Sequence, residues 1–233
     1  MGSLDFSAIL PALPYLFGTG MTLTLGLTGL AGALGLILGI LLAMMRLSAS
    51  RPVSMIAGAY VNLMRSVPLL LIIFWFYFLV PYLGAWVLQS PRPVQVGAFN
   101  SAIISFTLFE AAYFCEIMRA GILSVSTGQM SAGMALGLSY RQTMTNVILP
   151  QALRNMGPSL ITRLITLFQD TALVYVVALT DFLGAATKIG QRDGRLTEMY
   201  LFVAAVYLVV CFGASQLVKR LERRATARRE IGT

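Results

Sequence analysis

The chain has 233 residues, and 58% of them are apolar, whereas soluble domains are about 45–50% apolar. This composition excludes an ordinary soluble domain and indicates a single membrane-embedded domain. The net charge is +8, but six of the seventeen basic residues lie between Lys219 and Arg229. A basic tail beside an apolar segment indicates a cytoplasmic anchor rather than nucleic-acid binding.

The first apolar segment, residues 6–45, carries no charged residue and is longer than the roughly 20 residues that one membrane helix needs. Pro11 and Pro14 interrupt its beginning, and proline breaks or kinks helices. We therefore expect residues 1–14 to lie along the membrane surface and residues 15–45 to form one long, tilted helix. The N-terminus lacks the basic region of a signal peptide, so we expect this helix to stay in the membrane.

A repeat of small residues in the first helix predicts a close helix contact. Ala31, Gly35 and Gly39 recur every four residues, the spacing that lets two membrane helices approach closely. Chance is a fair alternative, because glycine is common in membrane helices. With four later apolar stretches, this segment predicts an all-α integral membrane protein. The five expected spans are residues 15–45, 53–82, 98–118, 157–179 and 197–218.

The second expected span contains the run N-L-M-R-S-V-P-L-L at residues 62–70. Pro68 removes a backbone donor and frees carbonyl groups one turn earlier, and in lipid such groups must face protein or a water-filled cavity. We therefore place Asn62, Arg65 and Ser66 near a possible translocation pathway. The alternative is that Arg65 only extends its guanidinium to the cytoplasmic interface.

The third expected span carries two acids with different expected roles. Glu110 lies near its middle, where an ionisable side chain is costly and usually functional. Glu116 and Arg119 are three residues apart and can pair on one helix face near the cytoplasmic end. We expect Glu110 to belong to a functional site and the pair to have a structural role.

The fourth expected span places opposite charges on one helix face. Arg163 and Asp170 are seven residues apart, about 10 Å along the helix axis, which we expect to be too far for direct contact. The gap suits a zwitterion with a second charge, whose ammonium is attracted by Asp170 and whose acidic side chain is bound by the planar guanidinium of Arg163. Alternatively, Arg163 pairs with Glu110 or Asp170 through water and holds the bundle together. Nearby polar groups come from Thr162, Thr166, Gln169 and Thr171.

Residues 124–156 are a polar stretch between the third and fourth spans. Gly137 can end a first short helix, residues 130–136, because glycine adopts positive φ without penalty. Ser139 then begins a second short helix, and Gln142 completes a capping box. Such a knob suits a groove on a soluble partner, although an ordinary helical loop is the alternative. The breaks that divide the stretch are Gly128, Gly133, Gly137 and Pro150.

A longer spacing pattern runs through the same stretch. Ser131, Ala132 and Gly133 are followed after three residues by Gly137, and after nine more by V-I-L-P, which ends at Pro150. This pattern resembles the cytoplasmic coupling loop of ABC importer permeases, E-A-A, three residues, G, nine residues, I-x-L-P. Serine replaces the acid and glycine the second alanine, so the salt bridge that this acid would make is not expected. The resemblance implies partner contacts at Ser131, Ala132, Gly133, Gly137, Leu138, Ser139 and Pro150.

Further motifs are similar to the polar amino acid branch of that family: residues 62–70, A-A-Y-F-C-E-I-M-R-A-G-I at 111–122, and P-Q-A-L-R at 150–154. The runs at residues 167–173 and 181–194 are most similar to glutamate/aspartate permeases, although Gln169 replaces a lysine of the family pattern. Residue chemistry and resemblance together predict a substrate site. Its expected members are Arg163, Asp170, Thr166, Gln169, Thr171, Asn62, Arg65, Ser66 and Glu110.

The predicted function is therefore that of a permease subunit of an ATP-driven importer of glutamate or aspartate. The resemblance implies a second permease, an external substrate-binding protein and ATP-binding cassette subunits that hold ATP and Mg²⁺. No G-x-x-x-x-G-K-[ST] motif occurs in this chain, so we expect it to bind no cofactor or metal and to catalyse no reaction. The alternatives are a permease for a neutral polar amino acid such as glutamine, and a proton-coupled secondary transporter that uses Glu110 and Asp170.

Five spans place the two termini on opposite sides of the membrane. Arg46, Arg51, Arg141, Arg154 and the basic tail fall on one side, which the positive-inside rule assigns to the cytoplasm. We therefore expect a bacterial inner-membrane protein whose N-terminus is outside and whose coupling loop and C-terminus are cytoplasmic.

Overall fold

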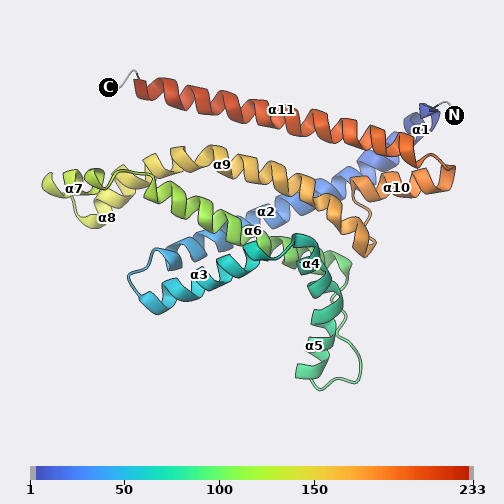
Figure 1. Ribbon diagram of the computed structural model, residues 1–233, viewed down its shortest axis with the longest axis horizontal. Coiled ribbons are helices and arrows are strands. Elements are labelled where there is room, and N and C mark those ends of the chain that lie inside the picture. The colour runs from blue at the N-terminus through green and yellow to red at the C-terminus, as the bar shows by residue number, and fades with distance from the viewer. Residues whose placement is uncertain (1–3, 231–233) are drawn as a thin grey trace.

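The computed structural model describes the backbone of residues 4–230 and the side chains of residues 4–220. The regular elements in this part of the chain are helical (Figure 1). The α-helices are α1 (Ile9–Tyr15), α2 (Thr22–Arg46), α3 (Arg51–Ser66), α4 (Leu69–Phe74), α5 (Val80–Val87), α6 (Ala98–Leu123), α7 (Thr127–Ala135), α8 (Tyr140–Thr143), α9 (Leu149–Asp170), α10 (Phe182–Asp193) and α11 (Leu196–Glu230).

Five helical stretches of the described chain are long and apolar enough to cross a membrane, which confirms the predicted all-α membrane fold. Most of the basic tail that we expect in the cytoplasm lies outside the residues whose side chains are described. The five stretches are Phe6–Arg46, Leu69–Val87, Ala98–Leu123, Tyr140–Val177 and Leu196–Arg220.

The long helices pack around α2 and α6, which make the most extensive helix contact in the described chain. α9 packs against α6, and α11 lies along α9 (Figure 1). α7 and α8 form one end of the molecule, whereas α1, α10 and the beginning of α11 lie at the other (Figure 1). The predicted site residues of α6 and α9 are therefore held between the two ends, and the predicted coupling knob stands at one of them.

The contact between α2 and α6 depends on small residues, as the spacing of Ala31, Gly35 and Gly39 predicts. Ala31 is fully buried. A Cβ atom added at Gly35 would lie 2.8 Å from the Cβ of Glu110, and one at Gly39 would lie 2.7 Å from the Cβ of Phe114. Carbon atoms pack best at about 3.5–4.0 Å, so only glycine allows α2 to come this close to α6.

The first helical stretch begins earlier than predicted. Residues 6–14, which were expected to be a surface segment, continue into α2 through α1 and the π-helical turn Leu16–Met21. Pro11 lies in the first turn of α1, where backbone N–H groups have no partner within the helix. Pro14 lies inside α1, directly before the π-helical turn. The prolines therefore do not end the helix. Pro14 interrupts the regular pattern of backbone hydrogen bonds, and the wider π-helical turn that follows lets the helix continue.

The predicted span over residues 53–82 is not one helix, and the apolar stretch of this region begins only at Leu69. α3 ends at Ser66, and Val67 is extended, with φ −108° and ψ 135°. α4 then begins after Pro68. A residue that precedes proline is driven away from the helical conformation by the proline ring, which explains a break at this position. α3 packs against α2 and α6, while the chain beyond the break takes a new direction (Figure 1).

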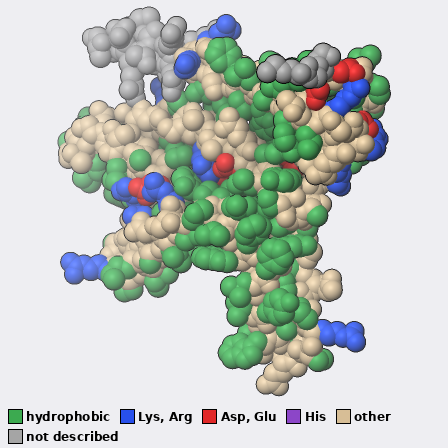
Figure 2. All heavy atoms as spheres, turned by 45° about the vertical axis from the view of Figure 1, so that its right-hand side comes forward, with side chains coloured by type: hydrophobic (Ala, Val, Ile, Leu, Met, Phe, Trp, Pro, Cys, Tyr) green, Lys and Arg blue, Asp and Glu red, His purple; other side chains and the backbone are tan. Residues whose placement is uncertain are grey.

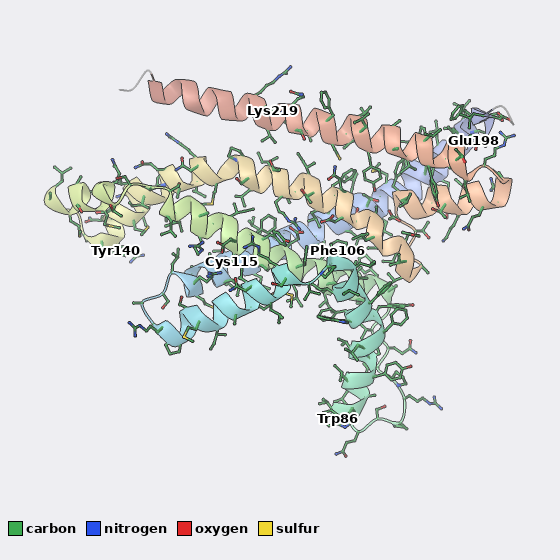
Figure 3. The ribbon with its side chains drawn as sticks, in the orientation of Figure 1. Trp86, Phe106, Cys115, Tyr140, Glu198 and Lys219 are labelled. Carbon is green, nitrogen blue, oxygen red and sulfur yellow. The ribbon has the colours of Figure 1, made fainter. Side chains whose placement is uncertain are left out.

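Residues 69–87, here called the arm, contain α4, the π-helical turn Trp75–Leu79 and α5. The arm projects away from the other long helices in Figure 1, and Trp86 lies near its far end in Figure 3. Within its most apolar stretch of 18 residues, only 11% of the residues are buried, compared with 61% in the corresponding stretch of α6. Apolar side chains form much of its visible surface, beside backbone and other side chains (Figure 2). The arm is thus the least buried of the five apolar stretches.

The coupling knob, which consists of α7, α8 and the turn between them, has the predicted local structure. α7 is followed by Gly137, whose φ is +81°. The Gln142 N–H donates to the Ser139 hydroxyl over 3.3 Å, and the Ser139 N–H donates to the Gln142 side-chain oxygen over 2.9 Å. These two bonds form the predicted capping box.

Three of the four predicted breaks in this region are not breaks. Gly128 and Gly133 lie within α7, and Pro150 lies in the first turn of α9, directly after the π-helical turn Met144–Ile148, whose wider hydrogen-bond pattern accommodates the missing N–H. The second helix of the knob is also not short, because α8 continues through the π-helical turn Met144–Ile148 into α9. Motion of the knob is therefore linked directly to the helix that carries the predicted site.

An irregular connection joins α9 to α10. The 3-10 helix Thr171–Val177 is followed by Ala178, whose φ is +62°. The fully buried Asp181 then caps α10, accepting bonds from the N–H groups of Leu183 (3.1 Å) and Gly184 (2.9 Å). Burial raises the pKa of Asp181 to about 6, although these backbone bonds act in the opposite direction.

Candidate functional site

A buried ion pair joins α6 to α9 between the two ends of the molecule. Arg163 Nε lies 2.8 Å from Glu110 Oε2, and Arg163 Nη2 lies 2.5 Å from Glu110 Oε1. The Glu110 side chain is completely buried, and the Arg163 side chain is 12% exposed. Paired bonds from a planar guanidinium to a carboxylate are among the strongest polar contacts in proteins. The pairing is therefore direct, not mediated by water.

Asp170, the last residue of α9, joins the same cluster. Arg163 Nη2 lies 3.7 Å from Asp170 Oδ2, so the prediction that these two side chains are too far apart for direct contact is wrong. The long arginine side chain spans much of the rise of about 10 Å along the helix axis. Asp170 is 28% exposed, so the charge cluster of Glu110, Arg163 and Asp170 is open on this side.

The ring of Tyr113 on α6 is a member of the site that the sequence argument missed. The Arg163 Cζ lies 3.9 Å from the centroid of this ring and 5.5 Å from that of Phe109. The Arg65 Cζ, at the end of α3, lies 5.3 Å from the same Tyr113 centroid, within the range of cation–π contacts. Tyr113 follows Glu110 by one helical turn, and this i,i+3 spacing is the signal that would have found it.

A cavity of about 250 Å³ lies beside Arg163. The Thr166 hydroxyl at its wall donates to the Thr162 carbonyl over 3.2 Å. The cavity is lined by hydroxyl groups and by Arg163, whose guanidinium also binds the two carboxylates of the charge cluster. Sites for small ligands combine a concave surface with a few placed polar groups, and this set suits a zwitterion. The lining residues are Ile117, Ser159, Thr162, Arg163 and Thr166.

The other predicted site residues lie outside the charge cluster. Gln169 is exposed, and Thr171 is fully buried and donates to the Phe168 carbonyl over 2.7 Å. Asn62 and Ser66 are exposed at the end of α3, where the Ser66 hydroxyl donates to the Asn62 carbonyl over 2.7 Å. This bond satisfies one of the carbonyls near the break before Pro68. The roles of Gln169, Thr171, Asn62 and Ser66 in substrate binding stay predictions.

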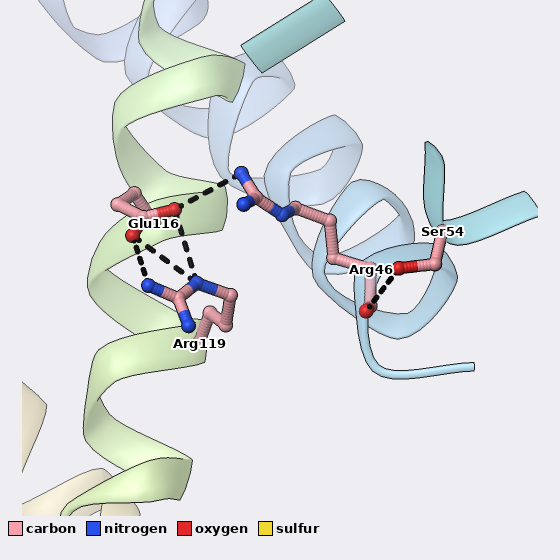
Figure 4. A network of polar contacts seen from close by, with 4 residues as sticks. All are labelled: Arg46, Ser54, Glu116 and Arg119. Carbon is pink, nitrogen blue, oxygen red and sulfur yellow. Dashed lines mark hydrogen bonds and ion pairs between the residues drawn. The ribbon is translucent and has the colours of Figure 1, made fainter. Parts of the chain in front are cut away.

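A second charged network surrounds Glu116 on α6 (Figure 4). Glu116 forms the predicted ion pair with Arg119, whose Nε lies 3.1 Å from Oε1. It also pairs with Arg46 at the end of α2, with Nη1 3.2 Å from Oε2. The Ser54 hydroxyl of α3 donates to the Arg46 carbonyl over 2.9 Å. This network, here called the Glu116 network, links α2, α3 and α6, and the sequence argument missed its contact with Arg46.

The knob presents apolar side chains at its tip: Met134, Leu136 and Tyr140 are 51%, 83% and 63% exposed. Tyr140 lies at this end of the molecule in Figure 3. Most of the predicted coupling residues are also accessible. Ser131, Ala132, Gly137, Ser139 and Pro150 are exposed, Leu138 is half-buried and Gly133 is buried.

The buried Gly133 explains one departure from the coupling-loop pattern. A Cβ atom at this position would lie 2.5 Å from the Cγ2 of Thr143, which is itself fully buried. Thr143 donates to the Ser139 carbonyl over 3.1 Å. An alanine at position 133 would therefore clash with the side chain that closes α8 onto α7, which accounts for glycine here.

Comparison with known proteins places these features in a family. Residues 35–227 match the family model described as "Binding-protein-dependent transport system inner membrane component". The chain is 49% identical over 224 residues to the glutamate/aspartate import permease protein GltK of Escherichia coli O157:H7, covering 96% of this chain and 99% of that protein. It is 34% identical over 222 residues to the arginine transport system permease protein ArtQ of Bacillus subtilis, covering 95% and 97%.

Among solved structures, the chain is similar to an amino acid ABC transporter crystallised with histidines. The TM-score is 0.84 at 32% sequence identity, and the match covers 96% of this chain and 100% of that chain. The fold, the sequence identity and the motif spacing thus indicate the same family over nearly the whole length of the chain. The chain belongs to the family of binding-protein-dependent transport system inner membrane components and, within it, to the permeases of amino acid ABC transporters.

Proposed function

We propose that this chain is a permease subunit of an ATP-driven importer whose substrates are glutamate and aspartate. The observation that carries this proposal is the 49% identity to a glutamate/aspartate import permease over 96% of the chain. Identity to the arginine permease is 34%. Membership of the ABC permease family also argues against the alternative of a proton-coupled secondary transporter.

The geometry of the site supports an amino acid as the substrate. The charge cluster brings a guanidinium and two carboxylates together beside a cavity that Ser159, Thr162 and Thr166 line with hydroxyl groups. Ionisable groups inside a membrane protein usually mark a substrate pathway. The zwitterionic backbone of an amino acid matches such a pairing of opposite charges, and this holds for acidic and neutral amino acids alike.

The coupling knob supports an ATP-binding cassette subunit as the partner on one side of the membrane. Its exposed apolar tip, with Leu136 83% exposed, is of the kind that docks a helix into a groove. ATP and Mg²⁺ would bind to that partner, and this chain would make no bond chemistry of its own. Because α8 leads into α9 without a loop, displacement of the knob would be passed to Arg163 and Asp170.

The remaining proposed partners are a second permease, identical or related, and an external substrate-binding protein. The poorly buried arm, residues 69–87, would be covered by the second permease and the lipid bilayer. The proposed orientation places the N-terminus outside a bacterial inner membrane and the knob and C-terminus in the cytoplasm. The knob and the connection between Arg46 and Arg51 lie toward the same end of the molecule (Figure 1), in agreement with the positive-inside rule.

The proposal is tested by uptake of radiolabelled glutamate into vesicles that contain the full complex, with and without internal ATP. We expect ATP-dependent uptake that unlabelled aspartate competes and that glutamine and histidine do not. Equal competition by glutamine would replace the acidic substrate with a neutral polar one within the same family. Uptake that ignores ATP and follows a pH gradient would overturn the proposed mechanism.

A further inference from the structure

The guanidinium of Arg163 is engaged by its own chain along one edge only. Its Nε and Nη2 atoms bind Glu110 at 2.8 and 2.5 Å, and Nη2 also lies 3.7 Å from Asp170. Within the described part of the chain, no hydrogen bond or ion pair involves the remaining nitrogen, Nη1. Arg163 also lines the cavity of about 250 Å³. A guanidinium has five N–H donors in a fixed plane, so the two donors on Nη1 are left for a ligand.

The ring of Tyr113 sets the plane in which these donors lie. The Arg163 Cζ lies over this ring, 3.9 Å from its centroid, and guanidinium groups stack on aromatic faces. Glu110 precedes Tyr113 by one turn of α6, so one helix supplies both the carboxylate at the edge of the guanidinium and the ring at its face. The edge contact fixes where the guanidinium lies, and the face contact limits how far it can tilt.

The ring of Tyr113, rather than its hydroxyl, makes this contact. No hydrogen bond among the described residues involves the Tyr113 hydroxyl. Phe109 supports the ring from the preceding turn, because it is 6% exposed and its centroid lies 5.0 Å from that of Tyr113. The Arg65 Cζ also lies 5.3 Å from the Tyr113 centroid. The ring thus contacts two cations, of which Arg163 lines the cavity.

The charges around Arg163 match the backbone of an amino acid. The two carboxylates of the charge cluster exceed its one guanidinium by one negative charge. The ammonium group of a bound amino acid would neutralise this charge at Asp170, which is 28% exposed. The α-carboxylate is bonded to the same carbon atom as the ammonium group, so it has to be received next to Asp170, where Nη1 of Arg163 supplies donors.

Tyr113 belongs to the run at residues 111–122, which resembles polar amino acid permeases in general. Such a run suits a task that does not depend on the side chain of the substrate, and every amino acid carries an α-carboxylate. We infer that Tyr113 is a positioning residue, whose ring holds the guanidinium of Arg163 in the plane from which Nη1 binds the α-carboxylate. The expectation that Arg163 binds an acidic side chain is thereby replaced. This inference rests on the proposed function, since it names how the amino acid backbone is held at the same site.

The test compares Tyr113→Leu and Tyr113→Phe with the wild type in the purified complex of the permease and its ATP-binding subunits, without the external binding protein. The two ligands are glutamate and its 1-amide, in which a neutral amide replaces the α-carboxylate. We expect Tyr113→Leu to weaken glutamate binding about 3–30-fold, the range for a lost cation–π contact, and to change binding of the 1-amide less than about twofold. Tyr113→Phe keeps the ring and should bind both ligands as the wild type does.

Phe99→Leu is the matched control, because Phe99 is an exposed aromatic residue in the first turn of the same helix. It should leave both affinities unchanged. Equal losses for both ligands at Tyr113→Leu, or no loss for either, would overturn the role of Tyr113. The same holds if Tyr113→Phe loses as much as Tyr113→Leu, or if Arg65→Gln reproduces the selective loss of glutamate. A wild-type complex that does not import glutamate would instead overturn the proposed function, so the two failures are distinguishable.

Discussion

Two acids of α6, six residues apart, are compensated in different ways. Glu110 is completely buried and is held by Arg163 through two direct bonds. Glu116 is 23% exposed and is shared by Arg46 and Arg119. A buried charge is tolerated only when it is paired and hydrogen-bonded, so Glu110 depends on Arg163. Glu116 can still be compensated by a second arginine or by water.

The difference shows that position in the bundle, rather than charge alone, decides what an ion pair does. The charge cluster lies beside a cavity and a shared aromatic ring, where its direct bonds hold the proposed substrate site in a fixed geometry. The Glu116 network lies near the α2–α3 connection and holds three helices together (Figure 4). The central acid of each network lies on the same helix, α6.

Removing Glu110 should have the largest effect on stability. Glu110→Ala removes both direct bonds to Arg163 and leaves only its 3.7 Å contact with Asp170, and breaking a buried ion pair costs about 3–5 kcal/mol. We expect a large fall in the unfolding midpoint of the detergent-purified complex. The double variant Glu110→Leu with Arg163→Met should regain most of this stability, since apolar replacements of similar volume are often tolerated, while glutamate binding stays lost. A stable single variant would contradict the comparison.

Asp181 extends the comparison to a buried acid whose described hydrogen bonds come from backbone N–H groups. Its pKa of about 6 exceeds the ordinary value of 3.8, so the folded state favours the protonated form. This contribution to stability is complete below about pH 4 and is lost as the pH rises toward 6. The pKa difference corresponds to at most about 3 kcal/mol.

The measurement is the unfolding midpoint of wild type and Asp181→Asn between pH 4 and pH 7. Asp181→Asn should flatten the profile in this window. Asp193→Asn is the control, because the Arg192 guanidinium lowers the pKa of the exposed Asp193 and it is ionised across most of the window. If the profile of Asp181→Asn keeps the wild-type slope, another group is responsible.

The close packing behind Glu110 gives a third, smaller effect. Gly35→Ala adds a Cβ atom 2.8 Å from the Cβ of Glu110, and overpacking of a tight contact costs about 1–3 kcal/mol. Gly29→Ala on the same helix meets no atom within 4 Å, so it should be neutral or slightly stabilising. Comparing the two variants separates the effect of close packing between α2 and α6 from the effect of helix propensity. Equal unfolding midpoints for Gly35→Ala and Gly29→Ala would show that the contact between α2 and α6 accommodates the added methyl group without cost.

Much of the fold follows from local patterns in the sequence. The apolar stretches predict five membrane helices, the spacing of Gly35 and Gly39 predicts the close contact on α2, and Ser139 with Gln142 predicts the capping box. Each of these features depends on residues that are near one another along the chain, where helical geometry alone fixes which side chains meet. The chain could therefore be assigned to its fold class from sequence.

The site was harder to predict because its contacts join distant residues. Arg65, Tyr113 and Arg163 come from three helices, and nothing in their local spacing brings them together. The contact between Arg46 and Glu116 spans 70 residues. Only the packed bundle determines such pairs. The direct contact of Arg163 with Asp170 was missed for a different reason, since the axial rise was considered without the reach of the arginine side chain.

The Glu116 network should give the smallest effect, and salt is the sharpest way to distinguish it from the charge cluster. Glu116→Gln removes a partly exposed ion pair, and such pairs contribute about 0–1 kcal/mol. Raising the ionic strength to about 1 M shortens the screening length to about 3 Å, so the difference between Glu116→Gln and wild type should largely vanish. The penalty of Glu110→Ala should persist, because salt does not reach a fully buried carboxylate. If both penalties fell equally with salt, the two acids would share one environment and the contrast between them would be lost.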